Sequence, residues 1–221
     1  TLPGGETEAY VYDIAGRLIA KTDFNGHTTT YAYDSRDRLI QITADPGHPS
    51  LSLPHATASK EFSYDTLGRR TFALALNANG DIIHHIDAMY DNRSRLVQVT
   101  TPYGVLAYSY DAAGNLTGVA SDNENGIELA YAYDALNRLQ TVYDHGAQQP
   151  PLEHHYTYNA VGSLQSMTYA SGVSHTYTYN SVNRLTSLAV ANTTGNLNSY
   201  AYTLNAIGHR TRMEEFSGRA V

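Results

Sequence analysis

The chain has 221 residues, of which 42% are hydrophobic and 16% charged, and its formal net charge is −7. This balance is typical of globular rather than disordered chains. The shortage of Lys and Arg excludes a nucleic-acid-binding surface, which needs clustered positive charge. The absence of Cys excludes disulfides, thiolate metal sites and Cys nucleophiles. The sequence has no run of about 18 apolar residues and no basic-apolar leader, so it predicts no membrane span and no signal peptide.

One phrase, Tyr-x-Tyr-Asp-x-x-Gly-Arg-Leu or a close variant, recurs nine times. We number each copy from its acidic or amide residue, called the anchor residue or position i. The anchor residues are Asp13, Asp34, Asp65, Asp91, Asp111, Asp134, Asn159, Asn180 and Asn205. They lie 20 to 31 residues apart, which indicates one supersecondary unit stacked on its neighbours. The other motif residues with an expected structural role are Tyr12, Gly16, Arg17, Leu18, Tyr33, Tyr64, Gly68, Tyr90, Tyr110, Gly114, Tyr133, Tyr158, Gly162, Tyr179 and Gly208.

Each copy contains two turn signals. The anchor residue can cap its own turn, and Gly, Asn or Asp at i+3 tolerates a left-handed backbone, with Ser94 as the one poor fit. Position i+3 alternates between Gly and another residue in all nine copies, which suggests a structural period of two copies. The second signal is a Gly that follows each anchor by 12 to 15 residues, and it is preceded by Asn at Asn25, Asn79 and Asn125. These second glycines are Gly26, Gly47, Gly80, Gly104, Gly126, Gly146, Gly172, Gly195 and Gly218.

Short segments with a period of two connect the turns. Aromatic residues occupy i−3 and i−1 in most copies, as in Tyr31 and Tyr33, and Leu recurs at i+5. Residues two apart share one face of a strand, so the aromatic residues form a line that stacking of successive copies is expected to bury. The sequence predicts one all-β array over residues 1–221, an antiparallel meander of hairpins in a spiralling sheet. It predicts no helix and a surface loop over Ala44–Ser59.

The repeated motif and its companion glycine cover essentially the whole chain, and they resemble the YD-repeat or Rhs-repeat family. That family includes bacterial Rhs proteins, the B and C components of insecticidal toxin complexes, wall-associated proteins and teneurins. The resemblance implies a long sheet that spirals into a hollow β-shell, which in the bacterial toxins encloses a C-terminal toxic domain. It implies a large secreted or cell-surface protein, of which this chain is the repeat part. Nothing after Asn205 resembles the family's autoproteolytic aspartate segment, so no cleavage activity is inferred.

The anchor aspartates form a row that suggests acid–base chemistry. However, the last three copies carry Asn, which can cap a turn but cannot act as a general base. A structural role is therefore favoured. On this interpretation Asp134→Asn is close to neutral for folding, and Asp134→Ala is destabilising.

Two further patterns suggest ion binding. The pairs His84–His85 and His154–His155 resemble metal ligands, but adjacent residues on a strand point to opposite faces and cannot readily share one ion. Asp122–Gly126 resembles a calcium loop but lacks the ligand spacing, so we expect a turn there. The sequence therefore predicts no metal, no cofactor and no enzyme activity.

We carry two hypotheses for the function. The first is a structural segment of an encapsulating β-shell in a large exported bacterial toxin or Rhs-type protein, whose partners are the rest of the shell and an enclosed C-terminal toxin domain. The alternative is a binding module whose outer β-surface recognises glycans, by stacking on the tyrosines, or a protein receptor. Neither terminal segment, Glu8–Tyr12 or Ser217–Val221, is a polar capping unit, so we also expect edge-strand self-association.

Overall fold

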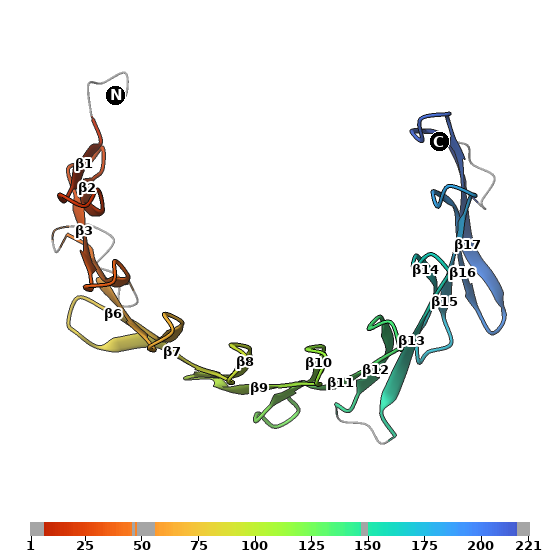
Figure 1. The fold of residues 1–221 in the computed structure, drawn as a ribbon, viewed down its shortest axis with the longest axis horizontal. Helices are drawn as coiled ribbons and strands as arrows, with labels where there is room; N and C mark the ends of the chain where they lie inside the picture. The colour runs from red at the N-terminus through yellow and green to blue at the C-terminus, as the bar shows by residue number, and fades with distance from the viewer. Residues whose placement is uncertain (1–6, 46, 48–55, 147–149, 216–221) are drawn as a thin grey trace. The chain divides into compact units, whose positions relative to one another are not determined.

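The computed structural model describes residues 7–45, 47, 56–146 and 150–215. Within these residues all the regular secondary structure is β-strand, and there is no helix (Figure 1). Consecutive strands pair antiparallel in one sheet, which is the predicted fold. The chain divides into two compact units, Thr1–Ala107 and Tyr108–Val221, which are described in turn.

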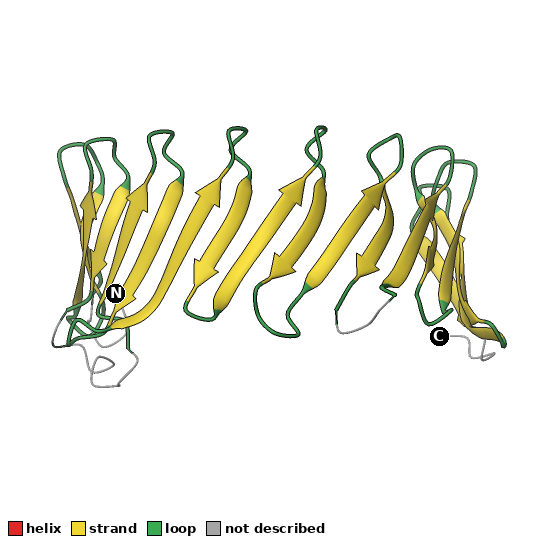
Figure 2. Ribbon diagram, turned by 90° about the horizontal axis from the view of Figure 1, so that it is seen from below, coloured by secondary structure: helices red, strands yellow, loops and turns green. Residues whose placement is uncertain are grey.

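The first unit contains four anchor hairpins. Its strands are β1 (Ala9–Tyr12), β2 (Leu18–Thr22), β3 (Thr28–Tyr33), β4 (Leu39–Thr43), β5 (Ser59–Tyr64), β6 (Arg70–Leu76), β7 (Ile82–Tyr90), β8 (Leu96–Thr101) and the first part of β9 (Gly104–Tyr110). Anchor turns join β1 to β2, β3 to β4, β5 to β6 and β7 to β8, and the second turns join the intervening pairs. Because the strands are antiparallel, the two kinds of turn lie at opposite edges of the sheet, as predicted (Figure 2).

The second unit continues the same pattern. Its strands after β9 are β10 (Leu116–Ser121), β11 (Glu128–Tyr133), β12 (Leu139–Asp144), β13 (Leu152–Tyr158), β14 (Leu164–Thr168), β15 (Ser174–Tyr179), β16 (Leu185–Asn192), β17 (Gly195–Leu204) and β18 (Arg210–Glu215). Anchor turns again alternate with second turns along the chain.

The anchor hairpins share one irregularity. In the hairpin of β3 and β4, Ala32 pairs with Gln41 but Tyr33 pairs with Leu39, so β4 carries one extra residue. The register shifts at the same place, between i−2 and i−1, in the other anchor hairpins with a described register. A bulge re-aims side chains on the strand that carries the extra residue. Here that strand follows the anchor turn, and the bulge sets the residue at i+5, usually Leu, opposite the residue at i−1, usually Tyr.

Alternation along the strands gives the sheet two different faces. Tyr31 lies opposite Ile42, and Tyr131 lies opposite Val142, so one face carries the aromatic residues and the apolar residue at i+8. In the second unit the other face carries mainly Ala, Ser and Thr, as in the pairing of β14 with β15 and of β16 with β17.

Neither face has a packed core. Within the described residues no hydrophobic side chain is buried, and Thr141, at 6% exposed, is the single buried residue. The expected burial of the aromatic line is therefore wrong in degree, because Tyr31 and Tyr131 are only half-buried. Most domains pack two layers around a core. This one-layer sheet instead depends on contacts within its own plane.

The three Asn-Gly sequences form hairpin turns, as predicted. Gly26 and Gly80 are left-handed, with φ of 83° and 85°, whereas in the third turn Asn125 is left-handed, with φ of 57°. Each turn thus uses one left-handed residue. The predicted loop at Ala44–Ser59 begins where the amide of Ala44 donates to the carbonyl of Ala58 at 2.8 Å. Its residues 46 and 48–55 lie outside the described part, as do Gly218 and the C-terminal segment Ser217–Val221.

Candidate functional site: the ladder between repeats

The motif builds the same turn nine times. In one example, the amide of Asp34 donates to the carbonyl of Arg38 at 2.9 Å, and the amide of Asp37 donates to the carbonyl of Asp34 at 3.1 Å. The Oδ1 atom of Asp34 accepts the amides of Arg36 and Arg38 at 2.8 and 3.0 Å. Asn159 makes the equivalent side-chain bonds at 3.1 and 2.9 Å. The anchor residue therefore caps its turn whether it is Asp or Asn.

The residue at i+3 is left-handed in all nine turns. These residues are Gly16, Asp37, Gly68, Ser94, Gly114, Asn137, Gly162, Asn183 and Gly208, with φ between 59° and 102°. Ser94, the residue expected to fit least well, adopts the same backbone, with a φ of 64° that is close to that of Asp37.

The alternation at i+3 has a hydrogen-bonding cause. Each non-Gly residue at i+3 accepts a side-chain hydrogen bond from the preceding repeat. The pairs are Arg17 to Asp37, Arg69 to Ser94 at 3.2 Å, Asn115 to Asn137 at 2.9 Å and Ser163 to Asn183 at 2.8 Å. Glycine has no side-chain acceptor at this position, so successive joints between repeats are of two kinds.

Five anchor aspartates also form an ion pair within their own turn. The pairs are Asp13–Arg17, Asp34–Arg38, Asp65–Arg69, Asp91–Arg95 and Asp134–Arg138, with Oδ2 to nitrogen distances of 2.6–2.7 Å. Hydrogen bonding to the Arg38 side chain and to backbone amides lowers the pKa of Asp34 from 3.8 to about 2. In the turn of Asp111, Nδ2 of Asn115 donates to the carboxylate at 2.8 Å. A cap alone therefore does not account for the aspartates, and Asp134→Asn would lose the ion pair.

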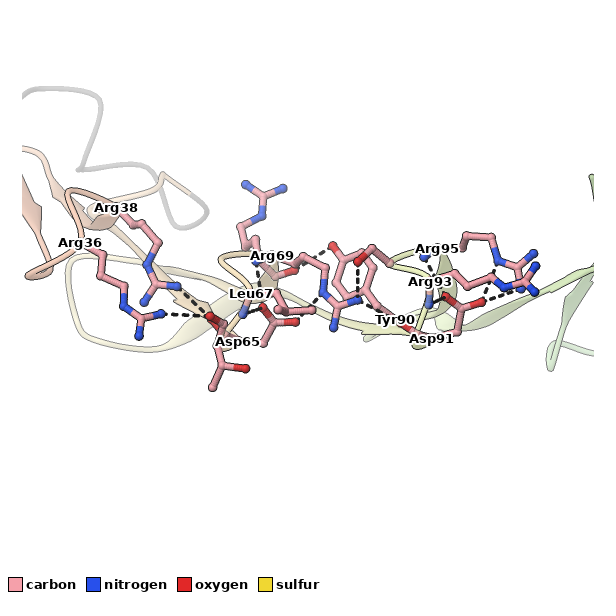
Figure 3. A network of polar contacts seen from close by, with 12 residues as sticks. Arg36, Arg38, Asp65, Leu67, Arg69, Tyr90, Asp91, Arg93 and Arg95 are labelled. Atoms are coloured by element: carbon pink, nitrogen blue, oxygen red, sulfur yellow. Dashed lines mark hydrogen bonds and ion pairs between the residues drawn. The ribbon is translucent and has the colours of Figure 1, made fainter. Parts of the chain in front are cut away.

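The arginine at i+4 also reaches forward to the next repeat (Figure 3). Nη1 of Arg38 donates to the carbonyl of Asp65 at 2.9 Å, and Nη1 of Arg69 donates to the carbonyl of Asp91 at 3.0 Å. The same guanidinium groups lie over the tyrosine at i−1 of the next repeat. The pairs are Arg17–Tyr33, Arg38–Tyr64, Arg69–Tyr90 and Arg138–Tyr158, at 4.7–5.1 Å from the ring centroid.

The tyrosine at i−1 reaches back to the preceding repeat. Its hydroxyl donates to the backbone carbonyl at i+5, for example from Tyr64 to Leu39 at 2.7 Å. The same bond joins Tyr33 to Leu18, Tyr90 to Arg70, Tyr133 to Leu116, Tyr158 to Leu139 and Tyr179 to Leu164, at 2.8–3.0 Å. Tyr12 and Tyr110 occupy the same position at the ends of β1 and β9.

We call these contacts the inter-repeat ladder. They join the side chain at i+4 and the carbonyl at i+5 of one repeat to the side chain at i−1 of the next repeat. At Tyr33, Tyr64, Tyr90 and Tyr158 a guanidinium group covers one face of the ring and the hydroxyl is hydrogen-bonded. These four rings are therefore not free platforms for a sugar ring, and no observation favours the glycan alternative.

The histidines and acidic residues singled out in the sequence form no metal centre in the described part of the chain. His84 stacks with Tyr103, with the ring centroids 6.1 Å apart, and His154 meets Tyr169 edge to face at 5.5 Å. Asn125 lies in the turn expected there, with the amide of Ser121 donating to the carbonyl of Ile127 at 2.7 Å. Among the described residues, no helix is long and apolar enough to cross a membrane.

Comparisons with known proteins agree with the geometry. A family model described as RHS Repeat matches residues 12–48, and one described as Teneurin YD-shell matches residues 54–202. No curated protein matches. The fold is similar to the crystal structures of TcdB2-TccC3 without its hypervariable C-terminal region (14% identity, TM-score 0.65) and of TcdB2-TccC3-TEV (15% identity, TM-score 0.63). Each likeness covers 95% of this chain and 11% of the other chain, so this chain spans a small part of those proteins.

Proposed function

Because the chain belongs to the Teneurin YD-shell family, we propose that it is a stretch of wall in a hollow shell that encloses a polypeptide. In this proposal residues 1–221 are one continuous array of repeats within a longer protein. The partners of the array are the remainder of the shell and an enclosed C-terminal toxin domain. The family and the fold are structural, and no enzyme activity is assigned to the chain.

The inter-repeat ladder is the observation that carries this proposal. A wall must hold together laterally while both of its faces stay open, one toward the lumen and one toward the outside. The described residues include no buried hydrophobic side chain, so cohesion has to come from the strand pairing and the ladder. Both act between neighbours in the plane of the sheet, as a wall requires.

One observation supports the enclosed domain. The similar protein TcdB2-TccC3 has a hypervariable C-terminal region, which its crystal structure omits. A variable segment after the repeats is what an exchangeable cargo would look like. The exported location is proposed from the family alone, because the absence of Cys is compatible with either compartment.

Limited proteolysis of the full-length parent protein tests the proposal. The segment that follows the repeats should resist protease in the intact protein. It should be cleaved when the ladder is broken by Arg38→Ala combined with Arg69→Ala. The matched control is Arg212→Ala, whose side chain pairs with Glu214 and makes no described contact between repeats. Equal protease sensitivity of the downstream segment in the intact protein and in the ladder variant would refute enclosure.

A further inference from the structure

One joint of the inter-repeat ladder lacks both of its usual parts. Arg184 occupies i+4, but its anchor residue is Asn180. The side chain of Asn180 is an amide, whose single oxygen already accepts the amide of Arg184 and which has no negative charge to offer the guanidinium. The residue at i−1 of the next repeat is Leu204 instead of Tyr. Arg184 keeps a hydrogen bond from Nη1 to the carbonyl of Ala206 at 3.2 Å. No carboxylate pairs with it in the described part of the chain.

A pocket of about 410 Å³ lies at this joint. Its lining comprises Arg184, Leu185, Tyr202, Leu204, Gly208 and Arg210. Leu204 and Leu185 are the residues at i−1 and i+5, which a tyrosine hydroxyl joins at the filled joints. Leucine is shorter than tyrosine and carries no hydroxyl. The space that the tyrosine ring fills in other repeats is therefore open here, and the hydrogen bond from the hydroxyl to the carbonyl at i+5 is not made.

The pocket is basic without a compensating acid. Arg210 stands at i+5, where most repeats carry Leu, and its guanidinium lies 5.2 Å from the ring centroid of Tyr202. Neither Arg184 nor Arg210 forms an ion pair among residues 150–215. The guanidinium of Arg184 lies directly over Gly208, where a Cβ atom would come within 2.5 Å of Cζ.

A joint that has both the anchor aspartate and the tyrosine, and arginines at the same two positions, shows what is missing. At that joint Arg38 stands at i+4 of one repeat and Arg70 at i+5 of the next, as Arg184 and Arg210 do. There Asp34 pairs with Arg38 at 2.7 Å, and Tyr64 lies under the same guanidinium at 4.7 Å. The charge of Arg38 is thus neutralised and the ring position is occupied. At Arg184 the protein has kept the cation and removed both partners.

We infer that this pocket binds a segment of polypeptide that presents an aromatic ring next to a carboxylate, such as Tyr-Asp. The ring would lie under Arg184 as tyrosine does at the filled joints, because a guanidinium favours an aromatic face. The carboxylate would be held by Arg184 and Arg210, since the planar fork of arginine suits carboxylate geometry. The inference is independent of whether the shell encloses a cargo.

Nuclear magnetic resonance of the ¹⁵N-labelled 221-residue chain tests the inference. N-acetyl-Tyr-Asp-amide should shift the Nε–H signals of Arg184 and Arg210, with a Kd of about 1 mM. N-acetyl-Tyr-Asn-amide and N-acetyl-Ala-Asp-amide should each bind about tenfold more weakly, because each lacks one of the two groups. Equal binding of all three peptides would overturn the inference, as would no shift with any of them.

Variants that restore the missing aspartate or tyrosine test the inference without removing any contact that stabilises the fold. Asn180→Asp returns the carboxylate and Leu204→Tyr returns the ring, so each restores the usual motif and should abolish peptide binding. Arg184→Gln should weaken binding about tenfold or more. Arg212→Gln, which removes an ion-paired arginine on the same strand as Arg210, should leave the Kd unchanged. Unaltered binding by both refilled variants would show that the peptide binds elsewhere.

Discussion

The hydroxyl of Tyr158 gives the sharpest test of the inter-repeat ladder. It donates to the carbonyl of Leu139 at 2.9 Å, while its ring lies 4.7 Å from the guanidinium of Arg138. Tyr158→Phe removes the hydroxyl and leaves the ring in place. The variant therefore isolates one hydrogen bond between two repeats.

The expected loss follows from that single bond. A neutral intramolecular hydrogen bond contributes about 1 kcal/mol to the free energy of unfolding. In a chain of this size that loss lowers the melting temperature by about 2–4 °C. Tyr158→Leu also removes the ring beneath Arg138, which contributes a further 0.5–1 kcal/mol or so. Tyr158→Leu should therefore cost about 2 kcal/mol.

Tyr156→Phe is the matched control. Tyr156 lies on the same strand, is also half-buried, and has no hydroxyl hydrogen bond in the described part of the chain. Urea unfolding followed by far-UV circular dichroism compares the midpoints of the three variants. Hydrogen exchange should also accelerate about fivefold at the joint of β12 and β13 in Tyr158→Phe. Identical midpoints for Tyr158→Phe and Tyr156→Phe would show that the hydroxyl bond contributes nothing.

Three further predictions concern the anchor residues and the sheet edges. The pKa of Asp34 is lowered from 3.8 to about 2, so its stabilisation is complete above the unfolded pKa and is lost as the pH falls from about 4 toward 2. Hydrogen exchange, corrected for intrinsic rates, should rise over that range at the Asp34 hairpin but not at the Asn180 hairpin, and a parallel rise at both would contradict the prediction. Asp134→Asn keeps the turn bonds but loses the ion pair with Arg138, so its urea midpoint should fall between those of the parent chain and Asp134→Ala; a midpoint equal to that of Asp134→Ala would contradict the capping role. All four residues of β1 are exposed, and among the described residues this strand pairs only with β2. Sedimentation velocity of the isolated chain should therefore show association that grows with concentration, and a monomer at every concentration would contradict this prediction.

The turns and strands could be predicted from the sequence because their signals are local. Asp13 and Gly16 are three residues apart, and together they specify a capped turn closed by a left-handed residue. The period-two segments around them specify strands with defined faces. Nine repetitions of these signals left little ambiguity about the meander.

The ladder could not be predicted in the same way, because its partners are far apart in sequence. Arg38 binds the carbonyl of Asp65, 27 residues later, and lies over Tyr64. The register of two hairpins must be known before that contact can be deduced. The recurrence of Arg at i+4 is visible in the sequence, but it does not by itself indicate an ion pair or a cation–π contact. The sequence likewise could not show that the described strands lack a core. A strand with one apolar face has the same period-two pattern whether that face is covered by a second layer or left open.

The lack of a core among the described strands determines how such a sheet yields to force. Each hairpin is held only by its two neighbours, so tension applied through the chain termini peels hairpins from an end, one after another, instead of rupturing the molecule at once. Every detachment releases one repeat of 20 to 31 residues, or about 65–110 Å of extended chain. An optical trap would record a staircase whose steps follow the spacing of the anchor residues, and a translocating motor would need to break only one joint at a time.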